Sequence, residues 1–445
     1  MTTCQDRGYI SPASLWPGRY KQRMRTDGTL SSPQERFLQE KVSAVIERGW
    51  FSLRWWAVWV LMSVCGAQIA TGSSTPEHAP YGEAIFLGQG REWRPYPLLV
   101  DINRDGHQDI VATHRYPVDQ NALHIWVGNG TRSFRAIPQT WPSPGYSGLA
   151  AGDINRDGHL DLLAASHFSR FHTLLGDSTG RFTDHVVKTR DGYTASELVD
   201  IDGDGHLDAI LLGWQKTGIE IYRGNGAGQW VLTTQLMAGA IGRDLTTADI
   251  NADGKVDLVV ATANRGVIVY LQNHMGDWLA QPTGFTSATR EFRSLAVGDI
   301  NRDGHLDIAL NGGFQGLREN NGPDVYVGGG QGTWTAASNG LKVAPSPPAW
   351  GIALGDVNQD GHLDIVAGGK TAGLSRHIAS GLFLFTGDGQ GIWSLQTQSG
   401  LPATGLLPPY SIRLTDLNQD GRLDMIVVHG ATKDNEGYLS IWFHK

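Results

Sequence analysis

Hydrophobic residues occur in short runs that acidic or glycine-rich segments separate. Typical runs are "SLAVGD" at 294–299, "DIVAGG" at 364–369 and "LFLFTGDGQGIW" at 382–393, the last with a glycine hairpin and an aromatic residue. Runs of this length rich in Val, Ile and Leu predict β-strands, and the hairpin glycines supply the positive φ that tight turns need. Each unit therefore reads as four antiparallel strands with no helical stretch between them, which is typical of a propeller blade.

Nearly the same acidic segment lies between the first and second strand of every unit. The seven copies start at Asp101, Asp153, Asp200, Asp249, Asp299, Asp356 and Asp416. Repeats of about 50 residues indicate one supersecondary unit per repeat. The predicted fold is an all-β, seven-bladed β-propeller of four-stranded antiparallel blades over residues 82–445.

The two ends of the repeat region predict how the ring closes. The last unit stops after its third strand, "YLSIWFHK" at 438–445, whereas "GEAIFLGQG" at 82–90 precedes the first unit and has no unit of its own. We expect residues 83–88 to supply the outer strand of the seventh blade, which would also cover an exposed sheet edge.

The acidic segment has the consensus D-x-[ND]-x-D-G-x-x-D, with oxygen-bearing side chains at positions 1, 3, 5 and 9. Alternate residues of an extended loop point the same way, and the glycine at position 6 allows a turn that brings the carbonyl of position 7 inward. Such an all-oxygen site favours Ca²⁺ over the smaller Mg²⁺. Seven copies with one set of offsets favour this reading over a solvated turn and predict up to seven calcium ions, one per blade.

Position 7 is His in five copies and Lys255 or Arg422 in the other two. This interchange predicts that only the carbonyl is used there and that the side chain faces solvent. The predicted calcium ligands are Asp101, Asn103, Asp105, His107, Asp109, Asp153, Asn155, Asp157, His159, Asp161, Asp200, Asp202, Asp204, His206, Asp208, Asp249, Asn251, Asp253, Lys255, Asp257, Asp299, Asn301, Asp303, His305, Asp307, Asp356, Asn358, Asp360, His362, Asp364, Asp416, Asn418, Asp420, Arg422 and Asp424.

The segment "GDINRDGHLDI" with a following "VYVGGG" resembles the FG-GAP and VCBS-type repeat of integrin α-subunit heads and of many bacterial secreted proteins. The resemblance covers residues 82–445. It implies a seven-bladed propeller with a calcium loop between the first and second strands of each blade. The phenylalanine-glycine and glycine-alanine-proline tags of the integrin repeat are mostly absent, so the bacterial style is the better match.

The formal charge is −8, but the seven acidic segments contain half of the 44 acidic residues, so the charge is concentrated in loops. This distribution argues against a nucleic-acid binder. Only Cys4 and Cys65 occur, both before the repeats, so the repeat region has no disulfide.

Residues 51–70 have a short apolar run after Arg48 and Arg54, followed by small residues, which is the order of a signal peptide. A cleaved signal, an uncleaved membrane anchor and lipid attachment at Cys65 are the three alternatives, and each predicts an extracytoplasmic protein that is secreted, periplasmic or anchored at the cell surface. Residues 1–50 are an N-terminal extension or follow from a start codon assigned too far upstream. Residues 71–81 have the composition of a linker.

The face opposite the calcium loops is built from segments that do not repeat, and aromatic and basic residues gather there. The candidate ligand-binding residues are Arg94, His114, Tyr146, His167, Tyr193, Trp214, Arg243, Arg293, Trp350, Lys370, Tyr410 and His429. This set predicts a monomeric binding module for glycans or protein partners. The alternative is a polysaccharide lyase with Tyr or His as base and Arg against a uronate. No motif fixes catalytic roles, so an enzyme is the less favoured reading.

Overall fold

The computed structural model describes residues 79–90, 97–113, 123–137, 146–177, 179–281, 283, 285, 290–314, 322–330, 332–341, 350–370, 380–430 and 436–445. These residues belong to one compact unit, Ser73–Lys445. The N-terminal extension, the targeting segment with Cys65 and most of the predicted linker lie outside the described residues. Within the described ranges, no helix has the length and apolar character needed to span a bilayer.

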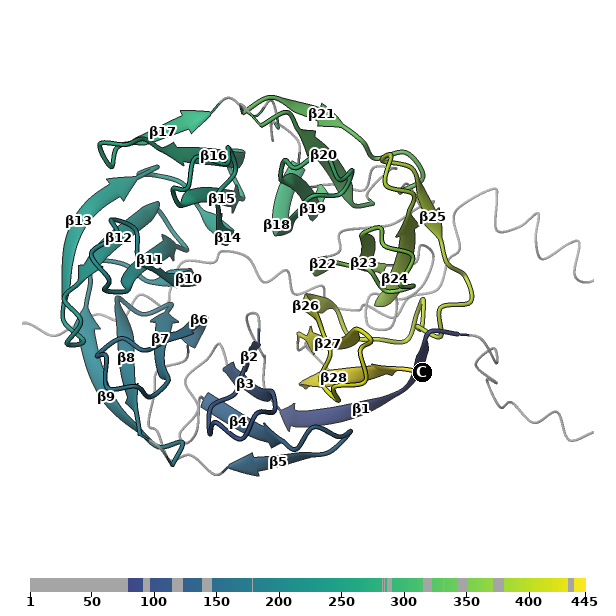
Figure 1. The fold of residues 1–445 in the computed structure, drawn as a ribbon, viewed down its shortest axis with the longest axis horizontal. Helices are drawn as coiled ribbons and strands as arrows, with labels where there is room; N and C mark the ends of the chain where they lie inside the picture. The colour runs from purple at the N-terminus through teal and green to yellow at the C-terminus, as the bar shows by residue number, and fades with distance from the viewer. Residues whose placement is uncertain are drawn as a thin grey trace, which may run out of the picture. The chain divides into compact units, whose positions relative to one another are not determined.

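The described strands form seven four-stranded antiparallel sheets arranged in a ring (Figure 1), and residues of the inner strands line a central channel. The innermost strands are β2 (Leu98–Val100), β6 (Tyr146–Gly152), β10 (Tyr193–Val199), β14 (Gly242–Ala248), β18 (Arg290–Gly298), β22 (Ile352–Gly355) and β26 (Pro409–Thr415). The second strands are β3 (Asp109–Thr113), β7 (Asp161–Ser166), β11 (Asp208–Gly213), β15 (Asp257–Thr262), β19 (Asp307–Phe314), β23 (Asp364–Lys370) and β27 (Asp424–His429).

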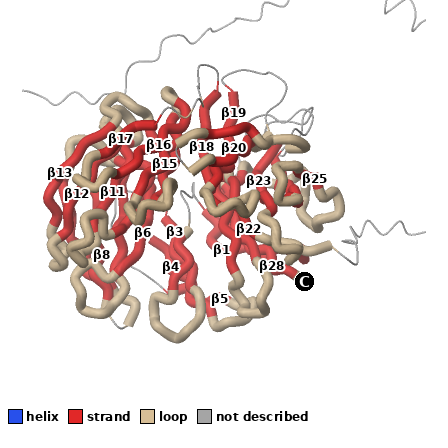
Figure 2. Tube along the Cα trace, turned by 45° about the horizontal axis from the view of Figure 1, so that its top comes forward, coloured by secondary structure: helices blue, strands red, loops and turns tan. Residues whose placement is uncertain are grey.

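The third strands are β4 (Leu123–Gly128), β8 (Arg170–Gly176), β12 (Ile219–Gly224), β16 (Gly266–Gln272), β20 (Asp324–Gly328), β24 (Ser380–Gly387) and β28 (Gly437–His444). The outermost strands are β5 (Phe134–Ile137), β9 (Phe182–Lys188), β13 (Trp230–Leu236), β17 (Trp278–Gln281), β21 (Trp334–Ala336), β25 (Trp393–Leu395) and β1 (Tyr81–Gly90). Three outer strands begin at the predicted residues Trp230, Trp334 and Trp393. Figure 2 shows the described chain as strands joined by loops, and the predicted propeller is confirmed.

The hydrophobic core lies between the blades. In β7, Leu162 and Ala164 pack in one cluster with residues of the preceding blade, whereas Leu163 and Ala165 pack in another with residues of the following blade. Successive side chains of a strand point to opposite faces, so a second strand sandwiched between two neighbouring sheets is apolar at nearly every position. This explains the unbroken apolar runs, and it makes each blade depend on both neighbours.

The ring closes through β1, as the sequence predicts. β1 pairs antiparallel with β28, with Ile85 opposite Ile441 and Leu87 opposite Leu439, in the sheet order β1-β28-β27-β26. Ile85 and Leu87 also pack against the cluster that joins the last blade to the first. The N-terminal strand therefore completes the last sheet and the last blade interface together.

We predict that a chain starting at residue 91 melts on the order of 10 °C below a chain starting at residue 79. The longer chain keeps β1, whereas the shorter one exposes the edge of β28 and loses the fully buried Tyr81 together with Ile85 and Leu87. Differential scanning calorimetry of both truncations gives the comparison. Equal melting temperatures would contradict the role of β1 in closure.

Acidic loops and the channel mouth

Each acidic loop is organised by hydrogen bonds from its main chain to its own side chains. In the fifth blade, the two carboxylate oxygens of Asp299 accept from the N–H groups of Asp303 (3.1 Å) and Gly304 (3.0 Å). Asn301 Oδ1 accepts from Asp303 N–H at 3.1 Å, and Asp303 Oδ1 accepts from His305 N–H at 2.8 Å. The side chains at positions 1, 3 and 5 therefore hold the main chain of their own loop in a compact turn.

Two positions of the loop have a left-handed backbone. Gly304 at position 6 has φ +86°, and a Cβ added there would meet no atom within 4 Å, so the backbone angle and not crowding requires glycine. Arg302 at position 4 has φ 58° although it is not glycine. Gln419, at position 4 of the seventh repeat, has the same left-handed backbone, and its side-chain amide donates to the carbonyl of Gly106 at 2.7 Å. Gly106 belongs to the acidic loop of the next blade around the ring.

The aspartate at position 9 is fully buried and is the first residue of the second strand. Asp307 Oδ2 accepts from Ile300 N–H in its own loop (2.7 Å), and Oδ1 accepts from Gly328 N–H on the third strand (2.8 Å). Burial raises the pKa of this carboxyl in each repeat, to about 6 for Asp364 and Asp424. Because main-chain donors engage both oxygens, a cation would have to share them with these hydrogen bonds.

The histidines at position 7 correct the prediction that their side chains face solvent. All five are half-buried, and the rings of four of them lie over a glycine of the neighbouring hairpin: His107, His206, His305 and His362. A Cβ added to Gly130 would lie 2.5 Å from the His107 ring, and one added to Gly330 would lie 2.4 Å from the His305 ring. Where histidine and glycine face each other in this way, glycine is needed for space as well as for its turn, whereas Arg422 at position 7 of the seventh repeat is exposed.

One group of acidic side chains among the described residues has the geometry of a metal site. Asp200, Asp202 and Asp208 in the third blade place carboxylate oxygens within 4.8 Å of one another. In the second blade, the buried Asp153 Oδ1 has no hydrogen-bond partner among the described residues. Its other oxygen, Oδ2, accepts from Gly158 N–H at 2.9 Å, so Oδ1 is the oxygen that is left to accept a further donor or to bind a cation.

The profile of the FG-GAP-like repeat matches residues 101–164, 153–211, 200–260, 249–310 and 316–367, which is more than half of the chain. The chain belongs to this family. Each of the first four matches contains two of the acidic loops described above, and the fifth contains one. We therefore call these the FG-GAP loops of the protein.

Curated relatives place this FG-GAP protein at a distance from the integrin α chains. Integrin alpha-V of Gallus gallus is 28% identical over 213 residues, which cover 40% of this chain and 20% of the integrin. The T-cell immunomodulatory protein homolog of Plasmodium yoelii yoelii is 24% identical over 176 residues, or 38% of this chain and 20% of that protein. The chain thus matches about a fifth of the length of these relatives.

Solved structures support the fold alone. YCF48 bound to D1 peptide superposes with a TM-score of 0.51 at 13% identity, covering 83% of this chain and 97% of that structure. The WD40 repeats of RRP9 give a TM-score of 0.50 at 11% identity, with 82% and 99% covered.

A cavity of about 270 Å³ opens at the end of the channel opposite the FG-GAP loops. Its walls include the starts of inner strands, such as Thr194 and Arg243, and the residues that follow second strands, His167 and Trp214. The FG-GAP loops join the other ends of these strands, so the cavity lies on the face that does not repeat. We call this cavity the channel mouth; it is lined by Gly148, Leu149, His167, Thr194, Ala195, Ser196, Glu197, Trp214, Arg243, Asp244, Leu245, Arg293, Trp350, Tyr410, Ser411 and Arg413.

Aromatic rings and charges form one side of the channel mouth. The Trp350 and Tyr410 rings stack with centroids 4.0 Å apart, and the Arg293 guanidinium lies 4.3 Å from the Trp350 centroid. Glu291 accepts hydrogen bonds from both Arg293 (2.9 Å) and Arg243. These contacts link strands of the fourth, fifth and seventh blades with Trp350, so the side chains of this wall hold one another in place.

Two buried donors on the opposite side of the channel mouth have no partner among the described residues. They are Ser196 Oγ, in a residue 6% exposed, and Trp214 Nε1, whose ring lies 4.9 Å from that of His167. Buried polar groups are hydrogen-bonded in the large majority of cases. Two such donors in one cavity are therefore an unusual feature of the channel mouth.

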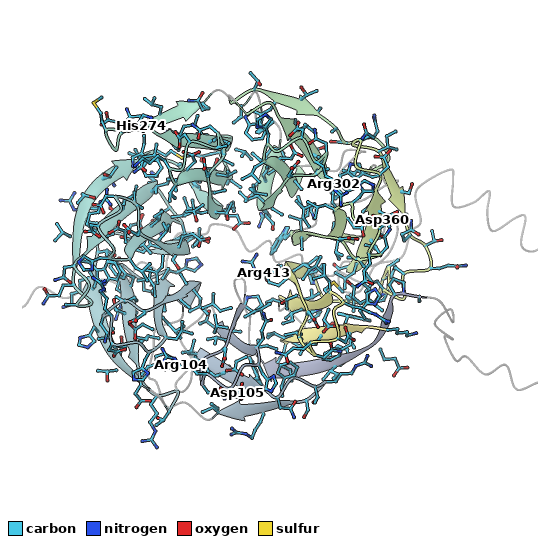
Figure 3. The ribbon with its side chains drawn as sticks, in the orientation of Figure 1. Arg104, Asp105, His274, Arg302, Asp360 and Arg413 are labelled. Atoms are coloured by element: carbon cyan, nitrogen blue, oxygen red, sulfur yellow. The ribbon has the colours of Figure 1, made fainter. Side chains whose placement is uncertain are left out.

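The centre of the channel mouth has charges of both signs. Arg413 is exposed and points into the channel in Figure 3. Burial raises the pKa of Glu197 to about 7; Arg413 opposes this shift and Asp244 adds to it. Asp244 is buried, and its carboxylate accepts from Leu245 N–H (3.0 Å) and Leu295 N–H (2.9 Å).

The structure brings half of the predicted ligand-binding residues together at the channel mouth: His167, Trp214, Arg243, Arg293, Trp350 and Tyr410. Arg94 and His114 lie outside the described residues, as do the side chains of Tyr146 and Lys370. Sequence reasoning missed Ser196, Glu197, Asp244 and Arg413. A charged residue within an inner strand is a signal that could have found the last three.

The prediction that Tyr193 and His429 belong to the ligand-binding face is wrong, because both side chains are fully buried and cannot contact a ligand at the surface. The Tyr193 hydroxyl donates to Glu220 Oε2, inside the interface between two blades. His429 is hydrogen-bonded to the carbonyl of Leu407 (3.0 Å) and to Ser440 Oγ (2.8 Å). Burial lowers the pKa of His429 to about 4.

We predict that Asp161→Ala lowers the free energy of unfolding by about 3 kcal/mol in the presence of a chelator, whereas Asp157→Ala lowers it by less than about 1 kcal/mol. Buried Asp161 accepts from Gly176 N–H (2.8 Å), Ile154 N–H (2.8 Å) and Asn155 N–H (3.2 Å), and exposed Asp157 holds only its own loop. Urea unfolding with EDTA measures both variants. Equal losses would show that position 9 has no special structural role.

Proposed function

We propose that this protein is a calcium-stabilised, extracytoplasmic binding module that holds an acidic sugar of a glycan at the channel mouth. The observation that carries the proposal is the pair of unpartnered donors, Ser196 Oγ and Trp214 Nε1, in one cavity. Membership of the FG-GAP family and the distant likeness to integrin α chains support a binding role.

The chemistry of the channel mouth favours a ligand with both a carboxylate and hydroxyl groups. Ser196, Trp214 and the exposed Arg413 are donors, which suits a carboxylate. Glu197 and Asp244 are acceptors, which suits hydroxyls. A uronic acid has both kinds of group, whereas an aspartate or glutamate side chain has acceptors alone. A cavity of about 270 Å³ lies just below the range of about 300–1,000 Å³ for ligand sites, which favours one sugar residue over a long segment of polymer.

Calcium would be held by the FG-GAP loops, at the end of the blades away from this cavity. The loops present carboxylate and amide oxygens from positions 1, 3, 5 and 9, and FG-GAP repeats typically bind calcium. The ion would neutralise carboxylates that crowd each loop and so stabilise the blade. The likeness to integrin α chains and the apolar run at residues 51–70 support an extracytoplasmic location.

We predict that EDTA lowers the melting temperature and that added calcium restores it. Without the ion, the carboxylates of each loop repel one another, and the ion binds only the folded loop. Thermal scans in EDTA, in calcium and in magnesium give the comparison. A melting temperature that calcium and EDTA leave unchanged would overturn the calcium role.

We predict that Trp214→Phe and Ser196→Ala each weaken binding of an oligouronate about 3- to 10-fold, because each change removes one hydrogen bond to the ligand and little packing. Trp230→Phe is the matched control, since its N–H donates to Thr173 Oγ1 at 2.8 Å within the protein. Screening against uronate, neutral-sugar and acidic-peptide ligands identifies the class, and calorimetry measures affinity. Binding of neutral sugars or acidic peptides alone would contradict the proposal.

We predict that oligouronate binding strengthens as the pH falls from 8 to 6. Burial raises the pKa of Glu197 to about 7, so this carboxyl takes up a proton as the pH falls through this range and loses the charge that repels an anionic ligand. Glu197→Gln leaves the other side chains of the cavity unchanged, so the difference between this variant and the parent isolates Glu197. Identical pH profiles for the two would exclude Glu197 as the cause.

A further inference from the structure

The third repeat departs from the other six at two positions that face each other. Position 3 is Asp202, whereas every other repeat has Asn there. On the third strand, Gly224 N–H donates to the aspartate at position 9, and the residue before Gly224 is Arg223. Its counterparts are all uncharged: Val127, Leu175, Leu271, Val327, Thr386 and Phe443. The extra negative charge and the extra positive charge thus occur in the same repeat.

The two side chains are joined in the structure. Arg223 Nη1 lies 2.7 Å from Asp208 Oδ2 and 3.0 Å from Asp202 Oδ2, so one guanidinium nitrogen bridges positions 9 and 3. Asp208 is fully buried, and the Arg223 side chain is 27% exposed. These two carboxylates belong to the acidic group, with Asp200, whose oxygens lie within 4.8 Å of one another. The acidic group is therefore gathered around a cation that the chain itself supplies.

The loop around this ion pair also differs from the others. In the fifth repeat, position 1 accepts from the N–H of position 5, whereas in the third repeat Asp200 Oδ1 accepts from Gly203 N–H at position 4, at 2.8 Å. Asp202 has no amide to donate to position 5, as Asn301 does to Asp303 at 2.9 Å. The side-chain hydrogen bond from position 3 to position 5 is therefore absent here, although Asp202 Oδ1 still accepts from Asp204 N–H at 3.3 Å. Asp202 Oδ2 is bridged to Arg223 instead.

Calcium and the guanidinium would compete for the same oxygens. Calcium binds oxygen at about 2.3–2.6 Å, and Nη1 already lies within hydrogen-bonding distance of two of the oxygens that an ion would need. Two cations in contact with the same carboxylates would also repel each other. The guanidinium is always charged and is part of the same chain, so its effective concentration at these carboxylates is high. A free calcium ion would have to displace it.

We propose that Arg223 takes the place of the ion in the third repeat, so that this loop is closed by an internal salt bridge and takes up no calcium while the other loops do. The inference rests on the proposed calcium role of the family loops. It assigns the acidic group of the third blade to structure, and it makes this blade the one whose loop persists when calcium is removed.

The test counts calcium ions bound to the whole chain by isothermal titration calorimetry and, independently, by equilibrium dialysis with metal analysis. The double variant Asp202→Asn/Arg223→Val restores the residue types of the first repeat, Asn103 and Val127, and is expected to bind one more ion per chain than the parent. The reciprocal variant Asn103→Asp/Val127→Arg is expected to bind one fewer.

Equal ion counts for the parent and the restored variant would overturn the inference while leaving the calcium role intact. A chain that binds no calcium in any form would overturn both. Melting scans in EDTA test the salt bridge without any bound ion. Arg223→Val alone leaves Asp202 without its cationic partner, so it should melt at a lower temperature than Asp202→Asn/Arg223→Val, which removes both charges. The opposite order would count against the salt bridge.

Discussion

A single buried carboxylate holds each blade together. The aspartate at position 9 accepts one hydrogen bond from the acidic loop and one from the third strand, as Asp307 does from Ile300 and Gly328. The loop, the second strand and the third strand are therefore fixed by one side chain. Since this carboxylate is buried, it needs those donors or a cation, and the loop supplies oxygens for a cation directly beside it. The segment repeats because every blade needs its own copy of this connection.

The two ends of a blade are under different constraints. At the loop end, nearly every polar side chain serves a main-chain N–H or the next loop, so few residue types fit. At the other end, the strands simply stop, and their side chains are free to differ from blade to blade. One wall of the channel mouth consists of such unrepeated side chains: Tyr410, Trp350, Arg293, Glu291 and Arg243. They come from different blades and are in contact only because the ring closes.

The repeated features could be read from the sequence because they are local. The seven blades, the outer strand from the N-terminal segment and the aromatic residues that open outer strands all follow from alternation and turn chemistry. The predictions that were wrong concern side chains whose contacts are with residues distant in sequence or on another strand. Nothing in the local pattern places the ring of His107 over Gly130, or the Tyr193 hydroxyl against Glu220 inside a blade interface.

By itself, the sequence determined how many blades there are, where the acidic loops lie and which strand closes the ring, because hydrophobic periodicity and glycine positions act within one repeat. Only the tertiary structure decided which unrepeated side chains share a site. The channel mouth joins Ser196 with Arg413, more than 200 residues apart. The same holds within a blade, where Arg223 meets Asp202 only once the third strand is paired. Such contacts depend on how sheets pack around the ring, and no local pattern encodes that packing.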